Sequence, residues 1–314
     1  MLFSALLILG LFTTQAVVAP SVPTEAAIKV VAGNDVVADL VRAIACQDVE
    51  LFVLGQGADP HHYEPTPADA KKIESADLVL EFGLGLDRAM GKLHRATGSK
   101  AKLLVVAEGL AKKGSDAAVT GHADHADHDH NHDHESSAVD PHIWHDPSQV
   151  RILNERICAA LVAARPTSAE SFRSRSLELD SQLVKLDEWI KAQVLLIQES
   201  KRLLVTTHDG LQSFGNRYGF RVVGIEMTSD GADVAPSQLI KMVNALRETK
   251  SAVVFGDAAH HSRIAATVAR EANVRLIETL RLDSLLQPPA VEQGKAYLET
   301  MRLNVNTIVK ALQD

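Results

Sequence analysis

Short apolar strands alternate with helical segments twice along this chain, once on each side of a long helical stretch. In the first half we predict strands at 28–33, 49–54, 78–82 and 103–106, with one helix capped by Asn34 and Asp35 and a second helix at 68–75. The apolar face of the first helix is Val37, Leu40, Val41 and Ile44. In the second half we predict strands at 203–207, 221–225, 252–255 and 275–278, with helices at 211–218, 236–249, 262–272 and 291–312. This alternation predicts an α/β fold with parallel sheets flanked by helices, and functional residues at the carboxyl ends of the strands.

The long helical stretch lies between the two halves, at about 168–199. Apolar residues recur every three or four positions in it without an intervening Gly or Pro, at Leu179, Leu183, Leu186, Ile190, Val194 and Ile197. Such a helix would span roughly 45 Å at about 1.5 Å per residue. A coiled-coil arm is the alternative, but the single apolar stripe shows no clear heptad. We therefore predict two lobes, 27–166 and 201–314, joined by one long rigid helix at 167–200.

The first 26 residues are expected to form a secretory signal peptide, because residues 2–19 are apolar and small residues follow. A feature against a signal peptide is that no Lys or Arg precedes the apolar core. No cysteine lies near the end of the segment, so a lipid anchor is not expected. No other stretch approaches the roughly 18 apolar residues that a membrane span needs. The mature protein is therefore expected to be soluble and periplasmic, and its net charge of −8 disfavours nucleic acid as a partner.

The two cysteines, Cys46 and Cys158, belong to no metal-binding spacing and both lie in apolar helical patterns. We expect two buried free thiols, with a disulfide as the alternative in an oxidising compartment.

A histidine-rich segment at 121–138 separates the last strand of the first half from the helix predicted at 148–164. Its histidines alternate mainly with Asp, Ala and Asn, at His122, His125, His128, His130, His132 and His134. Imidazole is a common ligand for zinc-like metals, and the segment has little apolar character with which to join a core. We predict a loop that attracts metal cations; the alternative is an incidental low-complexity insert.

Three further histidines and one carboxylate follow or separate the predicted core elements: His61, His142, His208 and Asp283. Two come from each predicted lobe, so they would meet if the sheets face each other across a cleft. Three imidazoles and a carboxylate form a tetrahedral ligand set suited to Zn²⁺, although Cu²⁺ and Ni²⁺ bind such sites at least as well.

Other residues near these positions compete for roles in the site. Asp59 and Asp140 each precede a Pro-His pair, and each would either orient an imidazole or cap a turn. The competing ligands are His62, His145, His260 and His261.

The segments around these residues resemble the cluster A-I substrate-binding proteins of zinc and manganese ABC importers, the group typified by ZnuA, TroA and AztC. The matching segments are 58–67 (ADPHHYEPTP), 140–144 (DPHIW), 207–210 (THDG) with Phe214 and 218–219, 282–284 (LDS), and 297–298 with Asn304. The resemblance implies two α/β lobes joined by one long helix, with the metal buried between them. It also assigns the ligand roles to His61, His142, His208 and Asp283.

The resemblance further favours zinc, because His208 stands where manganese-binding members tend to have Glu, and because a histidine-rich loop is a feature of zinc members. Two departures lie beside the expected cleft. Asp209 and Gly210 replace the usual aromatic residue after the third histidine, and His145 stands where an apolar residue is common.

From these features we expect a monomeric zinc-binding component of an ABC importer and not an enzyme. It would capture Zn²⁺ in the periplasm and deliver it to a membrane permease powered by a cytoplasmic ATPase, and a periplasmic metallochaperone could load it. The alternatives are a manganese- or iron-binding homologue, a zinc hydrolase with Glu64 as base, and an adhesin or structural domain. A hydrolase is disfavoured because Asp283 would fill the position that catalytic zinc keeps for water, and the chain has no HExxH motif.

Overall fold

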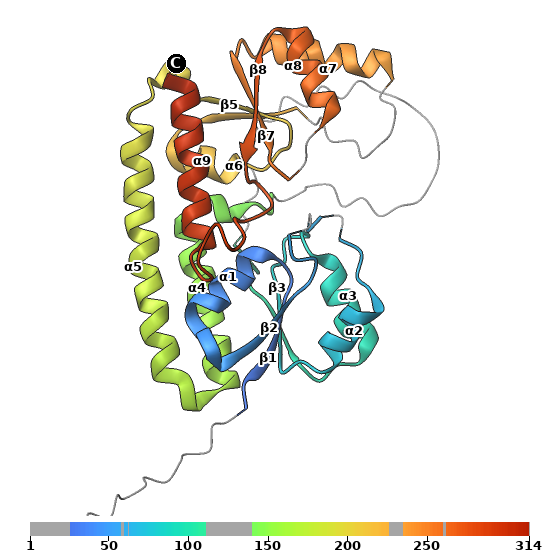
Figure 1. The fold of residues 1–314 in the computed structure, drawn as a ribbon, viewed down its shortest axis with the longest axis vertical. Coiled ribbons are helices and arrows are strands. Elements are labelled where there is room, and N and C mark those ends of the chain that lie inside the picture. The colour runs from blue at the N-terminus through green and yellow to red at the C-terminus, as the bar shows by residue number, and fades with distance from the viewer. Residues whose placement is uncertain are drawn as a thin grey trace, which may run out of the picture.

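The computed structural model describes residues 26–57, 60–61, 63–110, 140–225, 235–259 and 262–313. Within these ranges the chain forms two four-stranded parallel sheets, each flanked by helices, with long helices running beside both sheets (Figure 1). The predicted α/β fold class is confirmed.

The first sheet has the strand order β2-β1-β3-β4, and all of its pairs are parallel. Its strands are β1 (Ile28–Ala32), β2 (Val49–Val53), β3 (Leu78–Glu81) and β4 (Lys102–Val105), and its helices are α1 (Asp35–Ala45), α2 (Pro67–Glu74) and α3 (Arg88–Thr97). Two of these helices begin at clear sequence signals. The Asn34 side chain accepts a hydrogen bond from the Val37 amide, and Thr66 and Asp69 form a reciprocal capping box.

The second sheet repeats the same topology, with the order β6-β5-β7-β8 and parallel pairing throughout. Its strands are β5 (Leu203–Thr206), β6 (Arg221–Gly224), β7 (Val253–Asp257) and β8 (Arg275–Leu280), and its helices are α6 (Gln212–Tyr218), α7 (Pro236–Glu248) and α8 (Arg263–Ala272). Because both sheets are parallel, the loops that follow their strands gather at the carboxyl edges, where the candidate ligands lie.

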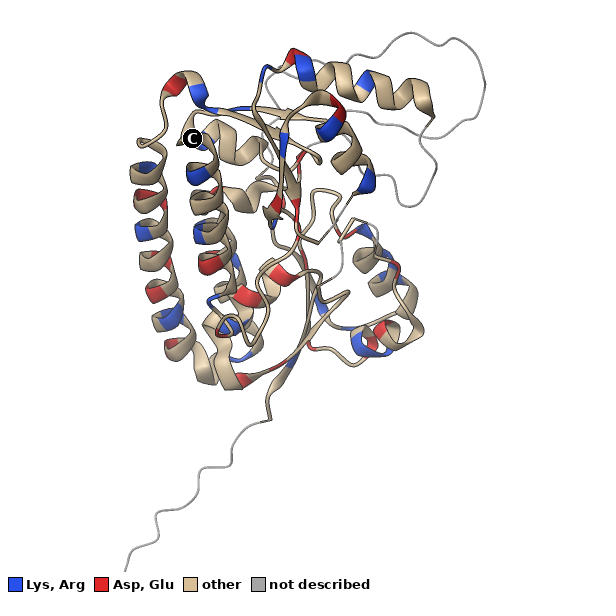
Figure 2. Ribbon diagram, turned by 45° about the horizontal axis from the view of Figure 1, so that its top comes forward, with Lys and Arg blue, Asp and Glu red and all other residues tan. Residues whose placement is uncertain are grey.

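Three further helices lie on one side of the molecule (Figure 1). Helix α5 (Ala169–Val194) runs past both sheets, whereas α4 (Pro147–Ala164) lies beside the first sheet and α9 (Ala296–Gln313) mainly beside the second. Helix α5 has 26 residues and is about 39 Å long at about 1.5 Å per residue. Figure 2 shows basic and acidic residues interspersed along α5, with no block of one sign.

One hydrophobic core joins the two halves of the molecule. A single cluster of buried side chains runs from β1 and α1, through α4 and α5, to strands of the second sheet and to α9. Phe172, Leu183 and Ile190 of α5 are fully buried in it. Smaller clusters lie between the first sheet and helices α2 and α3, and between the second sheet and helices α7 and α8. The shared core predicts that the two sheets move together as one packed unit.

Some elements differ from their sequence predictions. Helix α3 was not predicted, because its polar sequence buries only Met90 and Gly91. The long helix ends at Val194 and not at 199, since the chain turns there and buries Ile197 on its way to β5. Helix α9 begins at Ala296 and not at 291, because the preceding segment docks on α1, where Asp39 accepts a hydrogen bond from the Gly294 amide.

The cysteine prediction was half wrong. Both thiols are free, and Cys158 is buried as expected, but Cys46 is exposed. Cys46 lies where α1 ends and the backbone turns through a positive φ of 49°, so its side chain leaves the apolar face of the helix.

Several expectations fall outside the described residues. These are most of the signal peptide, the histidine-rich segment 121–138 with its six histidines, Asp59, His62, His260 and His261. None of the helices that the structure describes combines the length and apolar character needed to cross a bilayer.

Candidate metal centre

The structure brings the four candidate ligands from the two halves of the chain into one cluster. His61 lies between β2 and α2, and His142 precedes α4; His208 follows β5 and Asp283 follows β8. One donor atom from each of the four lies within 4.8 Å of the other three. The arrangement is the one that convergent strand-end loops were expected to produce.

The distances between the donor atoms match those between neighbouring ligand atoms around a single metal ion. His142 Nε2 is 3.1 Å from the Nε2 atoms of both His61 and His208, and 3.0 Å from Asp283 Oδ1. Asp283 Oδ1 lies 3.6 Å from His61 Nε2, and Oδ2 lies 3.4 Å from His208 Nε2. Ligands at about 2.0–2.1 Å from a tetrahedral zinc ion are separated by about 3.3 Å, so the cluster has the size that such an ion requires.

The four side chains are buried unequally, which gives the cluster an inner and an outer side. The side chains of His142 and Asp283 are 3% and 4% exposed, whereas those of His61 and His208 are 24% and 23% exposed. A cation would therefore enter and leave past His61 and His208.

Asp140 fixes the orientation of the innermost imidazole. Its Oδ1 atom lies 2.7 Å from His142 Nδ1 and also accepts a hydrogen bond from the His142 amide, while Oδ2 lies 3.4 Å from Ser213 Oγ. With Nδ1 donating to Asp140, the Nε2 atom that faces the cluster is free to present its lone pair to a metal. Asp140 thus both orients the ring and caps the turn, which the sequence left as alternatives.

The loop that carries Asp283 is held by side chains from three other elements. The Asn304 amide on α9 bonds both the amide and the carbonyl of Arg281. Asp257, at the end of β7, accepts from the amides of Leu282 and Asp283. These contacts leave the Asp283 backbone little freedom.

The third support for this loop comes from the segment that carries His142. Trp144 Nε1 donates to the Leu282 carbonyl at 3.1 Å, and His145 Nε2 lies 3.0 Å from the same oxygen. Burial, together with the charge of His142, lowers the pKa of His145 to about 4, so this ring is neutral. His145 thus joins the segment of His142 to the loop of Asp283 and is not one of the four clustered residues. Glu64, the base considered for a hydrolase, is exposed.

The charge state of the inner pair is set by its neighbours. Burial disfavours the charged form of His142, but the hydrogen bond that it donates to Asp140 and the contacts with Asp283 outweigh this effect and raise the pKa of His142 to about 9. Burial likewise opposes ionisation of Asp283, but His142 and His61 hold the pKa of Asp283 well below its usual range. In the metal-free protein a proton on His142 thus compensates the buried carboxylate, and an arriving cation must displace it.

Gly210, one of the two departures from the family pattern, lies directly against the cluster. A Cβ atom there would lie 3.3 Å from His208 Cδ2 and 3.4 Å from His142 Cδ2. A side chain at this position would therefore press against both imidazole rings.

Sequence reasoning found the four clustered residues but not the roles of Asp257 and Asn304. Asp257 had a usable signal, because an acidic residue at the carboxyl end of a predicted strand belongs to the functional edge of a parallel sheet. Asn304 lies within a helix, and nothing in its local sequence indicates a contact with the Asp283 loop.

Comparisons with known proteins give related chains that cover almost the whole sequence. Residues 30–311 match the family model described as "Zinc-uptake complex component A periplasmic". The manganese-binding lipoprotein MntA of Bacillus subtilis is 30% identical over 292 residues, which cover 91% of this chain and 90% of that protein. The manganese ABC transporter substrate-binding lipoprotein PsaA of Streptococcus pneumoniae is 28% identical over 287 residues, covering 91% of this chain and 89% of its own.

Solved structures of metal-binding proteins share the fold of this chain. The periplasmic zinc-binding protein TroA of Treponema pallidum superposes with a TM-score of 0.75 at 25% identity, covering 91% of this chain and 99% of its own. A manganese-bound periplasmic metal-binding protein of Candidatus Liberibacter asiaticus superposes with a TM-score of 0.72 at 25% identity and with the same coverage.

Proposed function

Since this chain belongs to the family of metal-binding, substrate-binding components of ABC importers, we propose that it captures Zn²⁺ and delivers it to a membrane permease. Members of this family are transport proteins and not enzymes, and they work outside the cytoplasm. The observation that carries the proposal is the convergence of His61, His142, His208 and Asp283, whose donor atoms all lie within 4.8 Å of one another. We propose these four residues as the metal ligands.

The choice of zinc rests on ligand chemistry. Three imidazoles and one carboxylate match zinc sites, whereas manganese prefers a shell richer in oxygen. Manganese is the second candidate, because MntA and PsaA are named for it and the family spans both metals. The described part of the chain offers only one carboxylate in the cluster, which favours zinc.

The location and partners follow from the proposed role. We propose that residues 1–26 direct export to the periplasm, and that 27–166 and 201–314 act as two lobes linked by 167–200. The partners would be a permease and its cytoplasmic ATPase, with a metallochaperone as a further metal donor. The protein would meet the permease as a monomer.

We also propose that the histidine-rich segment gathers zinc near the cleft. Its ligands are His122, His125, His128, His130, His132 and His134. A segment with interchangeable ligands must lose conformational freedom on binding, so its affinity would be lower than that of a preorganised cluster.

The direct test is elemental analysis of the protein purified from its native compartment without added metal, combined with chelator competition for Zn²⁺ and Mn²⁺. We expect about one tightly held zinc ion per chain in the cluster and a much lower affinity for manganese. If the purified protein carries manganese and binds it more tightly than zinc in competition, the transported metal would be manganese and not zinc. Protein that carries and binds no transition metal would refute the proposal.

A further inference from the structure

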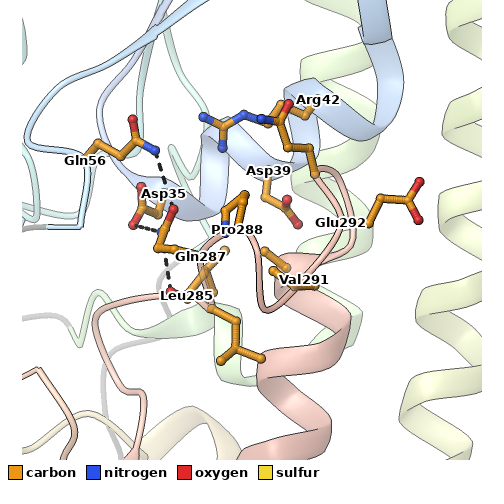
Figure 3. Close-up of a pocket in the computed structure, with 12 residues that line it drawn as sticks. Asp35, Asp39, Arg42, Gln56, Leu285, Gln287, Pro288, Val291 and Glu292 are labelled. Carbon is orange, nitrogen blue, oxygen red and sulfur yellow. Dashed lines mark hydrogen bonds between the residues drawn. The ribbon is translucent and has the colours of Figure 1, made fainter.

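Asp35 is a buried carboxylate at the start of α1, directly after the carboxyl end of the central strand β1. It is only 7% exposed and lies in the interface between α1 and the segment that connects β8 to α9 (Figure 3). Asp35 is not one of the four residues of the metal cluster.

One oxygen of Asp35 holds two separate loops. Its Oδ2 atom accepts a hydrogen bond from the Gly57 amide at 3.2 Å and another from Gln287 Nε2 at 2.9 Å. Gly57 lies four residues before His61, and Gln287 lies four residues after Asp283. The two loops that supply ligands from opposite halves of the chain therefore meet on a single atom.

The Gln287 side chain strengthens this junction. Its Oε1 atom lies 3.5 Å from Gln56 Nε2, in the loop of His61, and its Nε2 atom is 3.4 Å from the Leu285 carbonyl (Figure 3). The amide group thus contacts both loops as well as Asp35. The second carboxylate oxygen, Asp35 Oδ1, is buried and accepts no hydrogen bond from any residue that the structure describes.

We propose that Asp35 is a positioning residue that ties the His61 loop to the Asp283 loop and thereby slows the release of the bound metal. The proposal rests on the ligand set proposed above. Of the two loops, that of Asp283 is already held by Asp257, Asn304 and the Trp144 segment, whereas His61 lies on the more exposed side of the cluster. Detaching the His61 loop from Asp35 would free the outer ligand, so dissociation is the step that should accelerate.

The experiment measures zinc dissociation by chelator capture, together with the melting temperature of the metal-free protein. For Asp35→Ala we expect dissociation to accelerate about tenfold, at the lower end of the range for residues that support metal ligands. Gln287→Ala should accelerate it about fivefold, the effect of one lost hydrogen bond. The double variant should be no faster than Asp35→Ala alone, because both changes break the same junction.

Asp35→Asn separates positioning from charge. Its amide oxygen can take the place of Oδ2, and its NH₂ group can take the place of Oδ1, which accepts no hydrogen bond from the residues that the structure describes. We expect dissociation within about threefold of the unchanged protein, because the acceptor is retained. If Asp35→Asn released zinc as fast as Asp35→Ala, the negative charge and not the junction would be responsible, and the proposal would be wrong.

Asp39→Asn is the matched control. Asp39 lies one turn further along α1, is 3% exposed, and accepts hydrogen bonds from the amides of Gly294 and Tyr297, outside the four ligand loops. This variant should lower the melting temperature and leave zinc dissociation unchanged. Equal acceleration in Asp39→Asn and Asp35→Ala would reduce the effect to general destabilisation and overturn the proposal.

A further variant distinguishes failure of this inference from failure of the proposed ligand set. His142→Ala should abolish tight zinc binding. If it does and Asp35→Ala still releases zinc at the normal rate, only the positioning role is refuted. If His142→Ala retains tight zinc, the ligand set is wrong and the positioning role falls with it.

Discussion

At the scale of single residues, His142 is the side chain on which the proposed site depends most. It is the most deeply buried imidazole of the cluster, and its Nε2 atom lies within 3.1 Å of donor atoms from all three other members. Replacing it by Ala removes one ligand and also the orienting contact with Asp140. We expect zinc affinity, measured by chelator competition, to fall more than about 100-fold, beyond the effect of losing an outer partner.

His94→Ala is the control for this change. His94 lies on α3 with its Nε2 atom 2.9 Å from the Ala101 carbonyl, away from the cluster. Its replacement should leave zinc affinity unchanged. Equal losses in both variants would mean that histidine content, and not this cluster, accounts for binding.

The raised pKa of His142 predicts how binding depends on pH. Because the ring is protonated below a pKa of about 9 in the metal-free protein and must be neutral to bind a cation, metal binding displaces its proton. Apparent zinc affinity should therefore rise between pH 7 and pH 9. Titration calorimetry in buffers of different ionisation enthalpy should show close to one proton released from His142 per zinc ion at pH 7.5. The absence of proton release would mean that His142 does not bind the metal.

The residues of the cluster could be predicted because each follows or precedes a predicted strand or helix, and parallel topology brings strand ends together. Of the residues that support them, Asp140 could be predicted from its place before a Pro-His pair, and Asp257 carried a signal in its place after a strand, but Asp35 and Asn304 could not be predicted. Asp35 and Asn304 act through hydrogen bonds to backbone or side-chain groups far away in the sequence. Such contacts follow no helical or strand periodicity, so they become visible only when the loops are placed in space.

At the scale of elements, an ionic network joins α5 to α6 and α4. Asp187 of α5 accepts hydrogen bonds from Arg217 at 2.7 and 3.1 Å, from the Tyr218 hydroxyl at 2.9 Å and from Lys191 at 2.6 Å. Arg217 also lies 3.4 Å from Asp146, which caps α4. The network therefore fixes α6, which follows His208, against α4, which follows His142.

We expect Asp187→Asn to lower the free energy of unfolding by about 1–3 kcal/mol at pH 7, because charge-assisted hydrogen bonds are lost. The pKa of Asp187 is held near 2, mainly by the hydrogen bonds from Arg217 and Lys191, which outweigh the effect of burial. A depressed pKa stabilises the fold above the unfolded pKa of about 4, and this contribution is lost as the pH falls toward 2. Chemical unfolding at pH 7, 4 and 2.5 should thus show a difference between variant and parent that shrinks with acidity.

Asp180→Asn provides the comparison on the same helix. Asp180 pairs with Arg151 at 2.7 Å, but the two side chains are 33% and 45% exposed. We expect a loss below about 1 kcal/mol, as for other exposed ion pairs. Similar losses at both positions would contradict the structural role assigned to the Asp187 network.

Elements were predicted well where caps and apolar periodicity agreed, as in α1 and α2. Prediction failed where tertiary contacts decide the boundaries. Helix α9 begins late because the residues before it are docked on Asp39, which belongs to a distant segment. Helix α3 was missed because its sequence is mostly polar and buries only Met90 and Gly91.

At the scale of the whole molecule, the four clustered residues are brought together by elements other than the histidine-rich segment. His61 lies between β2 and α2, His142 precedes α4, and His208 and Asp283 follow β5 and β8. Deletion of residues 122–134 should therefore leave one tight zinc site with an affinity within about twofold of the full chain, as expected for independent sites. Titration calorimetry that found no tight site after this deletion would place the main site in the segment and not in the cluster.

The continuous core that joins the two sheets sets a limit on how far they can separate. Helix α5 contributes buried residues along its whole length, and α1, α4 and α9 complete the same cluster. A hinge closure of the kind found in two-domain binding proteins would have to break this packing, whereas rearrangement of the ligand loops would not. We expect the radius of gyration from small-angle X-ray scattering to differ by less than about 1 Å between metal-free and zinc-loaded protein, as in preorganised complexes. Hydrogen exchange should slow mainly in the loops of His61 and Asp283. A larger change in radius, with exchange altered along α5, would show that the shared core opens when metal is released.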